Sequence, residues 1–256
     1  MKLGLIGTGI IGEACVKGFY RVGNLQDEMF ISKRSEEKSA ALAAEFPQIT
    51  VLDCNQEIVD RCDVLILAVL PEQAEAVLRS LKLRPELRLL SIVSSITLQS
   101  LGEWAAPVTK ISRAIPLPPI EFGLGPIPMC PPTPELDYLL GPVGTVVSLT
   151  DETQFLSITV GSALMAMYYE MTSNIAKYMK DGGLSADEAA RYSSSMMVAL
   201  ADSTQREDYE GLVQMSEECL TPGGLNEQVL IGLRRAGWYD SLEKEMDGIK
   251  TRLSKY

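Results

Sequence analysis

The sequence contains no histidine. This absence excludes the usual histidine proton donor, the Ser-His and Cys-His nucleophile pairs, and any histidine-ligated metal site. The five cysteines are odd in number and scattered, without the close spacing of a zinc site or a redox motif. Chemistry must therefore rest on a bound cofactor, backbone amides, hydroxyls, lysines or carboxylates, and we expect no metal.

Long apolar runs are also missing. No stretch approaches the roughly 18 uninterrupted apolar residues that a membrane span needs. The first six residues carry neither a charged leader nor a cleavage site, so we expect a reduced cytoplasmic protein without a membrane partner. Positive charge is scarce as well, because 23 Lys and Arg face 34 Asp and Glu and leave a net charge of -11. Such a surface repels a phosphate backbone, and nucleic acid is not expected as a partner.

The chain of 256 residues is 46% hydrophobic, which is enough for one enzyme-sized unit or two small domains. Its first half alternates short apolar runs with helical patterns, as in a parallel sheet with crossover helices. Strands are predicted at residues 2–6, 29–32, 50–52, 64–69, 89–93, 108–112 and 145–149. Helices are predicted between them, at residues 12–22, 36–46 and 72–81. The pattern predicts a doubly wound α/β domain over residues 1–150.

The second half has a different composition. Prolines and glycines crowd residues 115–142, which predicts irregular or short-stranded structure leading to a boundary near residue 150. One long helix of about eight turns is then predicted from residue 151 to the stop at Gly182-Gly183. Ser185 and Glu188 form a capping box for a second helix that ends near Asp202. Further helices at 209–218, 225–235 and 240–253 complete a helical domain over residues 151–256.

A glycine-rich turn follows the first predicted strand and opens the first helix, with the sequence Gly7-Thr8-Gly9-Ile10-Ile11-Gly12. In a Rossmann-like fold the first glycine makes the tight turn, the second admits the pyrophosphate, and the third lets helix and strand pack closely. The helix start supplies unpaired N–H groups and a positive dipole end. We therefore predict that all six residues bind a dinucleotide. The alternative is a purely structural glycine turn.

The end of the second strand indicates which dinucleotide. NAD-binding folds place a carboxylate there, against the ribose 2'-hydroxyl. Here the chain has Ser32-Lys33-Arg34, whose hydroxyl, ammonium and guanidinium groups suit a 2'-phosphate. The three residues favour NADP(H) as the cofactor. A polar loop that merely precedes the helix from Glu36 is the alternative.

Several segments in order resemble the pyrroline-5-carboxylate reductase family, which reduces a cyclic imino acid to proline with a nicotinamide cofactor. The resemblance covers nearly the whole chain. It rests on the glycine turn and on Ser32-Lys33-Arg34, residues 55–64, Ala68-Val69 before Pro71, Ser91-Ile92 with Ile96-Thr97-Leu98, Arg113-Ala114-Ile115-Pro116, and Thr221-Pro222-Gly223-Gly224.

This resemblance implies a proline-biosynthetic oxidoreductase with defined cofactor contacts. Asn55 would lie near the adenosine of NADP(H), while Ala68, Val69 and Pro71 would line the path toward the nicotinamide. Asn55 is equally well explained as the polar start of a helix. The family also implies a homodimer or higher homo-oligomer through the C-terminal helices, with each active site completed by the partner chain.

Three departures from the family concern the substrate. The pair of threonines that normally follows the two late glycines is replaced by Leu225 and Asn226. The family's Met-Pro-Asn turn is Ile115-Pro116-Leu117, and its Ser-Gly-Ser-Gly-Pro-Ala-Tyr entry to the long helix is replaced around residues 159–163. The ring size and identity of the substrate are therefore open.

The late loop nevertheless has a physical case of its own. Gly223 and Gly224 immediately precede a predicted helix, whose first N–H groups lack internal partners and can hold a carboxylate. We predict that Gly223, Gly224, Leu225 and Asn226 orient an anionic cyclic imine. The Asn226 side chain would lie close to the ring nitrogen. A helix start with a flexible glycine lead-in is the alternative.

Imine reduction suits a chain without histidine, because a protonated imine is already electrophilic and needs mainly alignment with a hydride donor. Two other functions stay open. A dehydrogenase of the β-hydroxyacid type shares the architecture, but Gly161 and Lys177 do not fit its expected glycine-rich helix. A non-catalytic protein that binds or senses NADP(H) is consistent with the altered loop.

Overall fold

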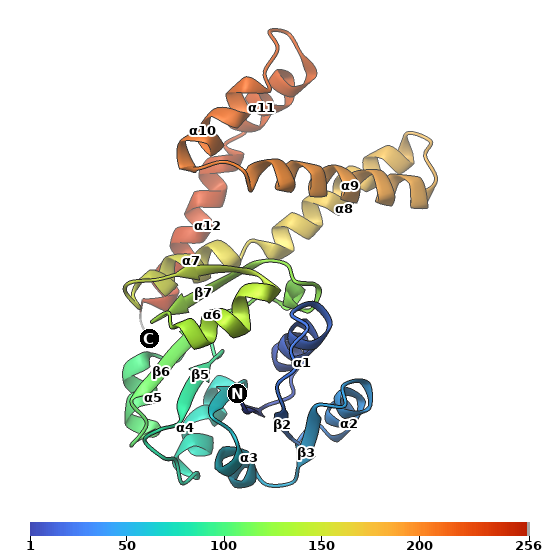
Figure 1. Ribbon diagram of the computed structural model, residues 1–256. Helices are drawn as coiled ribbons and strands as arrows, with labels where there is room; N and C mark the ends of the chain where they lie inside the picture. Colours follow the sequence, from blue (N-terminus) through green and yellow to red (C-terminus); the bar gives the residue numbers. More distant parts are fainter. Residues whose placement is uncertain (255–256) are drawn as a thin grey trace. The chain divides into compact units, whose positions relative to one another are not determined.

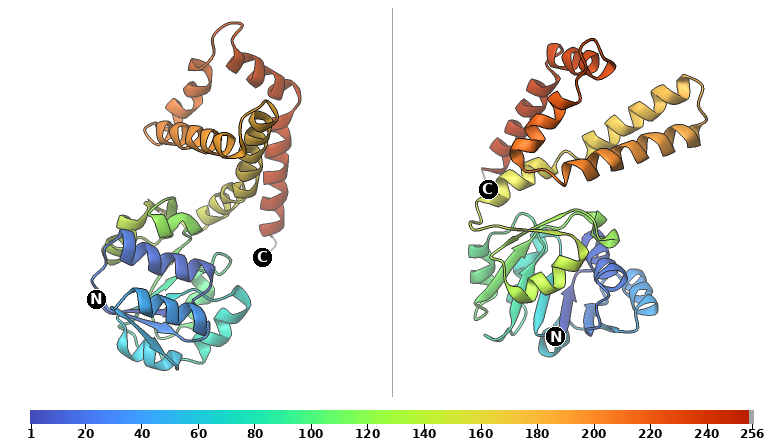
Figure 2. Two further views of the ribbon diagram at one scale, coloured as in Figure 1. Left: turned by 90° about the vertical axis from the view of Figure 1, so that its right-hand side faces the viewer. Right: turned by 45° about the horizontal axis from the view of Figure 1, so that its top comes forward.

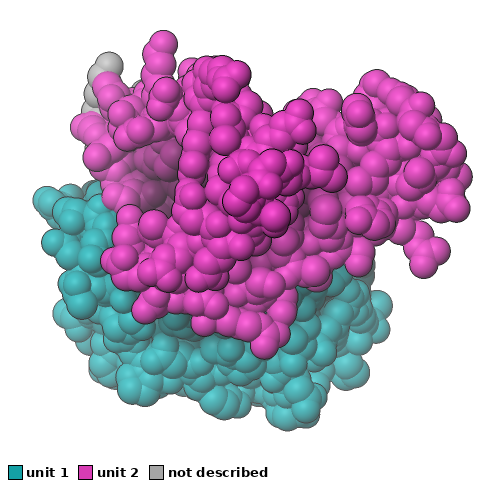
Figure 3. Space-filling view, turned by 90° about the horizontal axis from the view of Figure 1, so that it is seen from above, with its two compact units in different colours: residues 1–155 teal, residues 156–256 magenta. Residues whose placement is uncertain are grey.

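The computed structural model describes residues 1–254. The chain divides into two compact units, residues 1–155 and residues 156–256 (Figure 3). That these units fold as separate domains with a boundary near residue 150 stays a prediction.

The first unit is built on one eight-stranded sheet with the strand order β3-β2-β1-β4-β5-β6-β7-β8 (Figure 1). All neighbouring strands are parallel except β6 and β7, which are antiparallel. The strands are β1 (Leu3–Ile6), β2 (Met29–Ser32), β3 (Ile49–Leu52), β4 (Val64–Leu67), β5 (Arg88–Ser91), β6 (Lys110–Ala114), β7 (Pro126–Cys130) and β8 (Thr145–Ser148).

Helices cover both faces of this sheet, because the central strands are apolar on both sides (Figure 2). Leu3, Leu5 and Ile66 face one layer, made by α1 (Ile10–Lys17), its π-helical continuation η1 (Gly18–Val22), α2 (Glu36–Glu45), the 3-10 segments η2 (Pro118–Phe122) and η3 (Gly141–Val143), and α6 (Pro134–Leu140). Ile6 and Leu65 face the other layer, made by α3 (Asn55–Arg61), α4 (Pro71–Arg79) and α5 (Leu98–Trp104). The predicted doubly wound α/β fold is confirmed.

The predicted strands all occur, with ends displaced by a few residues. The strand β7 lies within residues 115–142, which were predicted as irregular or short-stranded without strand bounds. Pro126 and Pro128 hide it, since proline cannot donate to a sheet ladder and normally argues against a strand. In the structure, carbonyls of this segment accept hydrogen bonds from the residues that follow β6 and β8. Ile115 donates to the Pro128 carbonyl at 3.1 Å and Leu149 donates to the Met129 carbonyl at 2.9 Å.

In the second unit, the described residues 156–254 form helices and connecting turns without strands, as predicted. Its helices are α7 (Gln154–Ser162, which begins in the first unit), α8 (Met165–Asp181), α9 (Ala186–Thr204), α10 (Tyr209–Glu218), α11 (Leu225–Arg235) and α12 (Trp238–Leu253). Helices α8 and α9 form a hairpin (Figure 2) that turns at Gly182-Gly183, where Gly183 has φ +112°. The capping box predicted from Ser185 and Glu188 is present at the start of α9.

The prediction of one unbroken helix from residue 151 to Gly182 is wrong, because α7 ends at Ser162 and α8 starts at Met165. The break is local. Ala163 donates to Val160 and Leu164 donates to Gly161, the tighter i→i+3 pattern of a terminating helix. Gly161 weakens the helix by about 1 kcal/mol relative to alanine, whereas the apolar periodicity continues across the break and therefore conceals it.

Candidate functional site

The glycine turn connects β1 to α1, and two of its glycines are required by the backbone. Gly7 has φ +108°, and a Cβ there would overlap the carbonyl oxygen of Ala68. A Cβ on Gly12 would overlap the carbonyl oxygen of Gly7, so glycine allows α1 to approach the turn. A Cβ on Gly9 would meet no atom of residues 1–254 within 4 Å. Gly9 therefore faces open space, which is the property that a pyrophosphate-binding position needs.

The start of α1 lacks internal partners. Gly9 is its N-cap and offers no side-chain cap, so the first N–H groups of the helix remain available. The Oγ1 of Thr8 is buried without a hydrogen-bond partner among residues 1–254. Ile10, the first residue of α1, is 75% exposed. Free amides and the positive end of the helix dipole together favour an anion at this turn.

The turn lies at the point where the strand order of the sheet reverses. From β1 the chain winds outward through β2 and β3, and then returns to the other side of β1 with β4. Open α/β sheets bind ligands at the carboxyl ends of the strands beside such a switch point. Ala68 follows β4 directly and packs against Gly7, while Pro71 begins α4. The predicted residues Ala68, Val69 and Pro71 thus share this edge with the glycine turn.

A pocket of about 420 Å³ lies beside the ends of β2 and β3. It brings together Ser32, Lys33 and Arg34 with Asn55, which comes from a separate segment. Asn55 is the first residue of α3, as its alternative interpretation proposed. The four polar side chains nonetheless line one concave surface.

Each side chain of the predicted specificity segment, Ser32-Lys33-Arg34, has a distinct setting. Ser32 is buried, and its Oγ accepts a hydrogen bond from the Gly7 amide at 3.1 Å, which ties the segment to the glycine turn. Arg34 is exposed and donates from Nη1 to Oε1 of Gln73 at 3.0 Å. The guanidinium is therefore oriented by α4, with donors left for a ligand.

Asp53 is a member of this pocket that the sequence analysis missed. Its Oδ1 lies 3.1 Å from Nζ of Lys33, and Glu36 lies 3.8 Å from the same ammonium. The hydrogen bond with Asp53 is the main reason that the pKa of Lys33 is raised above its ordinary value. The available signal was positional, because Asp53 directly follows β3, the strand paired with β2.

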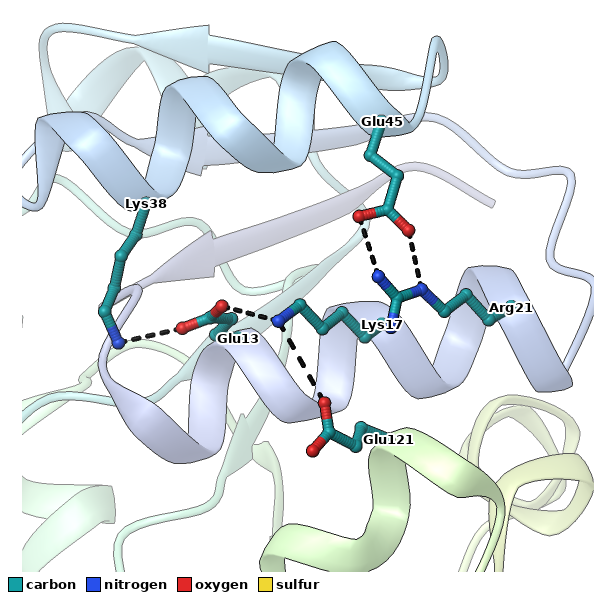
Figure 4. Close-up of polar contacts among 6 residues, drawn as sticks. All are labelled: Glu13, Lys17, Arg21, Lys38, Glu45 and Glu121. Carbon is teal, nitrogen blue, oxygen red and sulfur yellow. Dashed lines mark hydrogen bonds and ion pairs between the residues drawn. The ribbon is translucent and has the colours of Figure 1, made fainter.

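Ion pairs tie α1 to the elements around it (Figure 4). Glu13 accepts from Lys17 at 2.7 Å and from Lys38 of α2 at 2.8 Å. These two ammonium groups, Lys17 first, lower the pKa of the Glu13 carboxyl. A second pair joins Arg21 to Glu45 through both carboxylate oxygens, at 2.6 and 2.9 Å. The contacts hold the helix that carries the glycine turn against α2, which follows Ser32-Lys33-Arg34.

A buried arginine on β6 holds the loop that follows β5. Arg113 is 4% exposed, and its guanidinium pairs with Glu152, donates to the Ser94 carbonyl at 2.6 Å and lies 4.6 Å from the ring centre of Phe155. Glu152 also accepts from the Leu98 amide at 2.6 Å. Arg113 and Glu152 therefore fix the loop between β5 and α5 at the same edge of the sheet.

In the second unit, the loop at Gly223-Gly224 precedes a helix as expected, but two of its backbone amides already have acceptors within the protein. Gly223 has φ +72° and Gly224 is the N-cap of α11. The Gly223 amide donates to Oε2 of Glu227 at 2.7 Å, and the Gly224 amide donates to the Thr221 carbonyl at 2.7 Å. The amides of Leu225 and Asn226, in the first turn of α11, remain for a ligand.

The surroundings of this late loop are polar as well. Nδ2 of Asn226 donates to the Cys219 carbonyl at 3.3 Å. A pocket of about 500 Å³ extends from the loop along α11 and is lined by Gly223, Gly224, Glu227, Gln228, Ile231, Gly232 and Arg235. Leu225 and Asn226 do not line this pocket, and Leu225 is 81% exposed.

Other reactive groups offer little. Burial raises the pKa of the Cys15 and Cys62 thiols to about 12, which keeps both protonated. Within residues 1–254, no group of three or more Cys, Asp or Glu side chains has the arrangement of a metal site. Over the same residues, no helix is long and apolar enough to cross a membrane.

The comparisons with known proteins point in one direction. The family model described as "NADP oxidoreductase coenzyme F420-dependent" matches residues 2–96. Pyrroline-5-carboxylate reductase of Pseudomonas aeruginosa is 24% identical over 264 residues, covering 98% of this chain and 95% of that protein. The similarity therefore extends through both units.

Solved structures show the same fold. Pyrroline-5-carboxylate reductase of Streptococcus pyogenes superposes with a TM-score of 0.83 at 20% identity, covering 100% of this chain and 99% of that one. Pyrroline carboxylate reductase of Plasmodium falciparum, solved with NADP bound, has a TM-score of 0.82 at 19% identity, with 99% and 97% covered. The chain thus has the fold of these reductases.

Proposed function

We propose that this chain, a distant member of the pyrroline-5-carboxylate reductase family, is an oxidoreductase that uses NADPH to reduce the C=N bond of a small cyclic imino acid. The observation that carries the proposal is the glycine turn at the switch point of the sheet, joined through Ser32 to a pocket lined by Lys33 and Arg34. The family similarity, which extends over the whole chain, supports the same chemistry.

The residues present fit a dinucleotide. The free amides at the start of α1 and the open space at Gly9 suit the pyrophosphate, while Oγ1 of Thr8, which has no partner in residues 1–254, is buried at the same turn. Lys33 and Arg34 suit the 2'-phosphate, and Asn55, which lines the same pocket, would contact the adenosine. Ala68, Val69 and Pro71 would line the path toward the nicotinamide. NADPH, when bound, supplies the hydride.

The late loop suits the carboxylate of the substrate. The amides of Leu225 and Asn226 at the start of α11 provide two donors at the positive end of a helix dipole. Asn226 uses Nδ2 on the Cys219 carbonyl, so its Oδ1 is left to accept from a protonated ring nitrogen. Because a protonated imine already carries its proton, this orientation needs no histidine and no other general acid.

A homodimer completes this proposal. In the second unit, the buried residues among those that the structure describes are Val160, Ala189, Ser193 and Met197. Many large apolar side chains remain outside, including Val198 at 68% and Val229 at 62% exposure. Exposed apolar area on this scale marks a protein interface, and a second copy of the chain is the occupant that we propose.

The oligomer is tested by light scattering after size-exclusion chromatography. Val198→Asp should shift the protein toward monomer because it places a charge in the apolar face. Leu124→Asp is the matched control, since Leu124 is also exposed, at 61%, but belongs to the first unit, outside the C-terminal helices. A monomeric wild-type protein, or an unchanged Val198→Asp oligomer, contradicts the dimer.

The activity is tested by following NADPH oxidation with a panel of five- and six-membered cyclic imines, each with and without a carboxylate. Turnover of a carboxylate-bearing ring supports the proposal, and turnover of 1-pyrroline-5-carboxylate would assign the protein to proline synthesis. Preference for rings without a carboxylate contradicts the role of the Leu225 and Asn226 amides.

One observation favours a second function, an NADP(H)-binding protein without catalysis. Two amides of the late loop are already satisfied, by Glu227 and Thr221, and the carboxylate of Glu227 lies where it opposes an incoming anion. Tight NADPH binding with no turnover of any imine in the panel would favour this sensor over the reductase.

A further inference from the structure

We infer that Asp53 sets the balance between NADPH and NADH at this site, so that the pocket accepts both dinucleotides. The inference rests on the proposed function, because it concerns how the same cofactor pocket discriminates. It assigns to Asp53 the role that a carboxylate at the end of β2 has in NAD-binding folds.

The geometry brings this carboxylate in from the neighbouring strand. Ser32 pairs with Leu52 at the ends of β2 and β3, and the Lys33 amide donates to the Leu52 carbonyl at 3.2 Å. Asp53 is the next residue and so stands beside Lys33 across the strand ends. It lines the pocket that also contains Ser32, Arg34 and Asn55. The sheet thus places an acidic group at the specificity position although β2 itself carries none.

The charges around the pocket affect a 2'-phosphate and a 2'-hydroxyl in opposite ways. Asp53 lies 3.1 Å from the Lys33 ammonium and Glu36 lies 3.8 Å from it, so Lys33 is already paired in the absence of cofactor. A 2'-phosphate that recruits Lys33 must compete with these carboxylates and is repelled by Asp53. A ribose 2'-hydroxyl is instead a donor that a carboxylate accepts.

The pocket therefore contains two opposed recognition elements. Arg34, which is oriented by Gln73 and has no carboxylate partner among residues 1–254, favours the phosphate. Asp53 favours the hydroxyl. Lys33 can turn to either, because its ammonium has three donors and its side chain is 46% exposed. NADPH binding then depends on Arg34 and NADH binding depends on Asp53.

The test is Asp53→Asn, which keeps the shape of the side chain and removes its charge. The dissociation constants of NADPH and NADH are measured by the fluorescence of the reduced nicotinamide, at low and at high salt. The variant should bind NADPH about two- to fivefold more tightly, the range of an exposed charge interaction, and NADH more weakly than the wild type, because the charged acceptor for the 2'-hydroxyl is lost. The gain should shrink at high salt because exposed charges are screened.

Glu57→Gln is the matched control. Glu57 lies on α3, pairs with Arg61 and does not line the pocket, so its loss changes the net charge by the same amount. An equal gain in NADPH affinity in both variants would overturn the inference, since a general charge effect would then explain it. So would an unchanged ratio of the two affinities in Asp53→Asn, while NADPH still binds. A wild-type protein that binds neither dinucleotide would instead refute the proposed function itself.

Discussion

Arg34→Ala tests the cofactor assignment through the one cation of the pocket that has no carboxylate partner in residues 1–254. In the structure its guanidinium donates to Gln73 at 3.0 Å and is otherwise exposed. Binding of a 2'-phosphate would add charge-assisted hydrogen bonds from the guanidinium donors that Gln73 does not use. The substitution should therefore affect NADPH and leave NADH, which has no such phosphate, nearly unchanged.

The size of the effect follows from these contacts. A hydrogen bond to a charged group contributes about 1.5–3 kcal/mol, and the solvent exposure of Arg34 lowers this contribution. The net loss is then about 1–2 kcal/mol, which raises the NADPH dissociation constant about 5- to 30-fold. Thermal stability should stay close to that of the wild type, because an exposed contact is removed.

Isothermal titration with both dinucleotides measures this loss. Arg79→Ala is the control, since Arg79 lies on α4, pairs with Glu75 at 2.8 Å and is outside the pocket. Equal losses of NADPH and NADH affinity in Arg34→Ala would refute the reasoning, because the guanidinium would then not contact the 2'-phosphate.

Three further changes test the framework of the first unit. Gly7→Ala should destabilise the protein by about 1–3 kcal/mol in urea unfolding, because φ of +108° is strained for alanine; an unchanged midpoint would show that the turn relaxes. Glu152→Gln leaves the buried Arg113 without its carboxylate and should cost about 3 kcal/mol or more, whereas a loss below about 1 kcal/mol would contradict a buried ion pair. Glu13 has a lowered pKa, so its ion pairs stabilise the folded state above about pH 4.5 and this contribution disappears as the pH falls through the lowered value. Glu13→Gln should therefore reduce the loss of unfolding free energy between neutral and acidic pH. If the wild type and the variant lose the same free energy over this range, the ion pairs of Glu13 do not have this role.

Much of the fold follows from local patterns in the sequence. The strand β2 and the helices α10 and α11 have the predicted bounds, since apolar periodicity and clear turn residues define them. The pattern failed where a local break leaves periodicity intact, as at Ala163-Leu164. It gave no strand bounds where proline occurs inside a strand, as in β7.

The candidate site shows the same division. Gly7 and Gly12 were recognisable from their spacing, because a side chain at either position would overlap a backbone carbonyl of the turn or of the neighbouring strand end. Asp53 was not recognised, and Arg113 was named only within the segment of family resemblance, because their ion-pair partners are brought close only by the folded sheet. The pairing between Gly223 and Glu227 was also missed, although an acidic residue in the first turn of a helix commonly reaches back to an N-terminal amide.

A structure determined with NADPH and a cyclic amino acid tests the central claim most directly. The account predicts the 2'-phosphate beside Lys33 and Arg34, the pyrophosphate at Gly9, and the carboxylate on the amides of Leu225 and Asn226. A carboxylate bound elsewhere, or a dinucleotide away from the glycine turn, would contradict it.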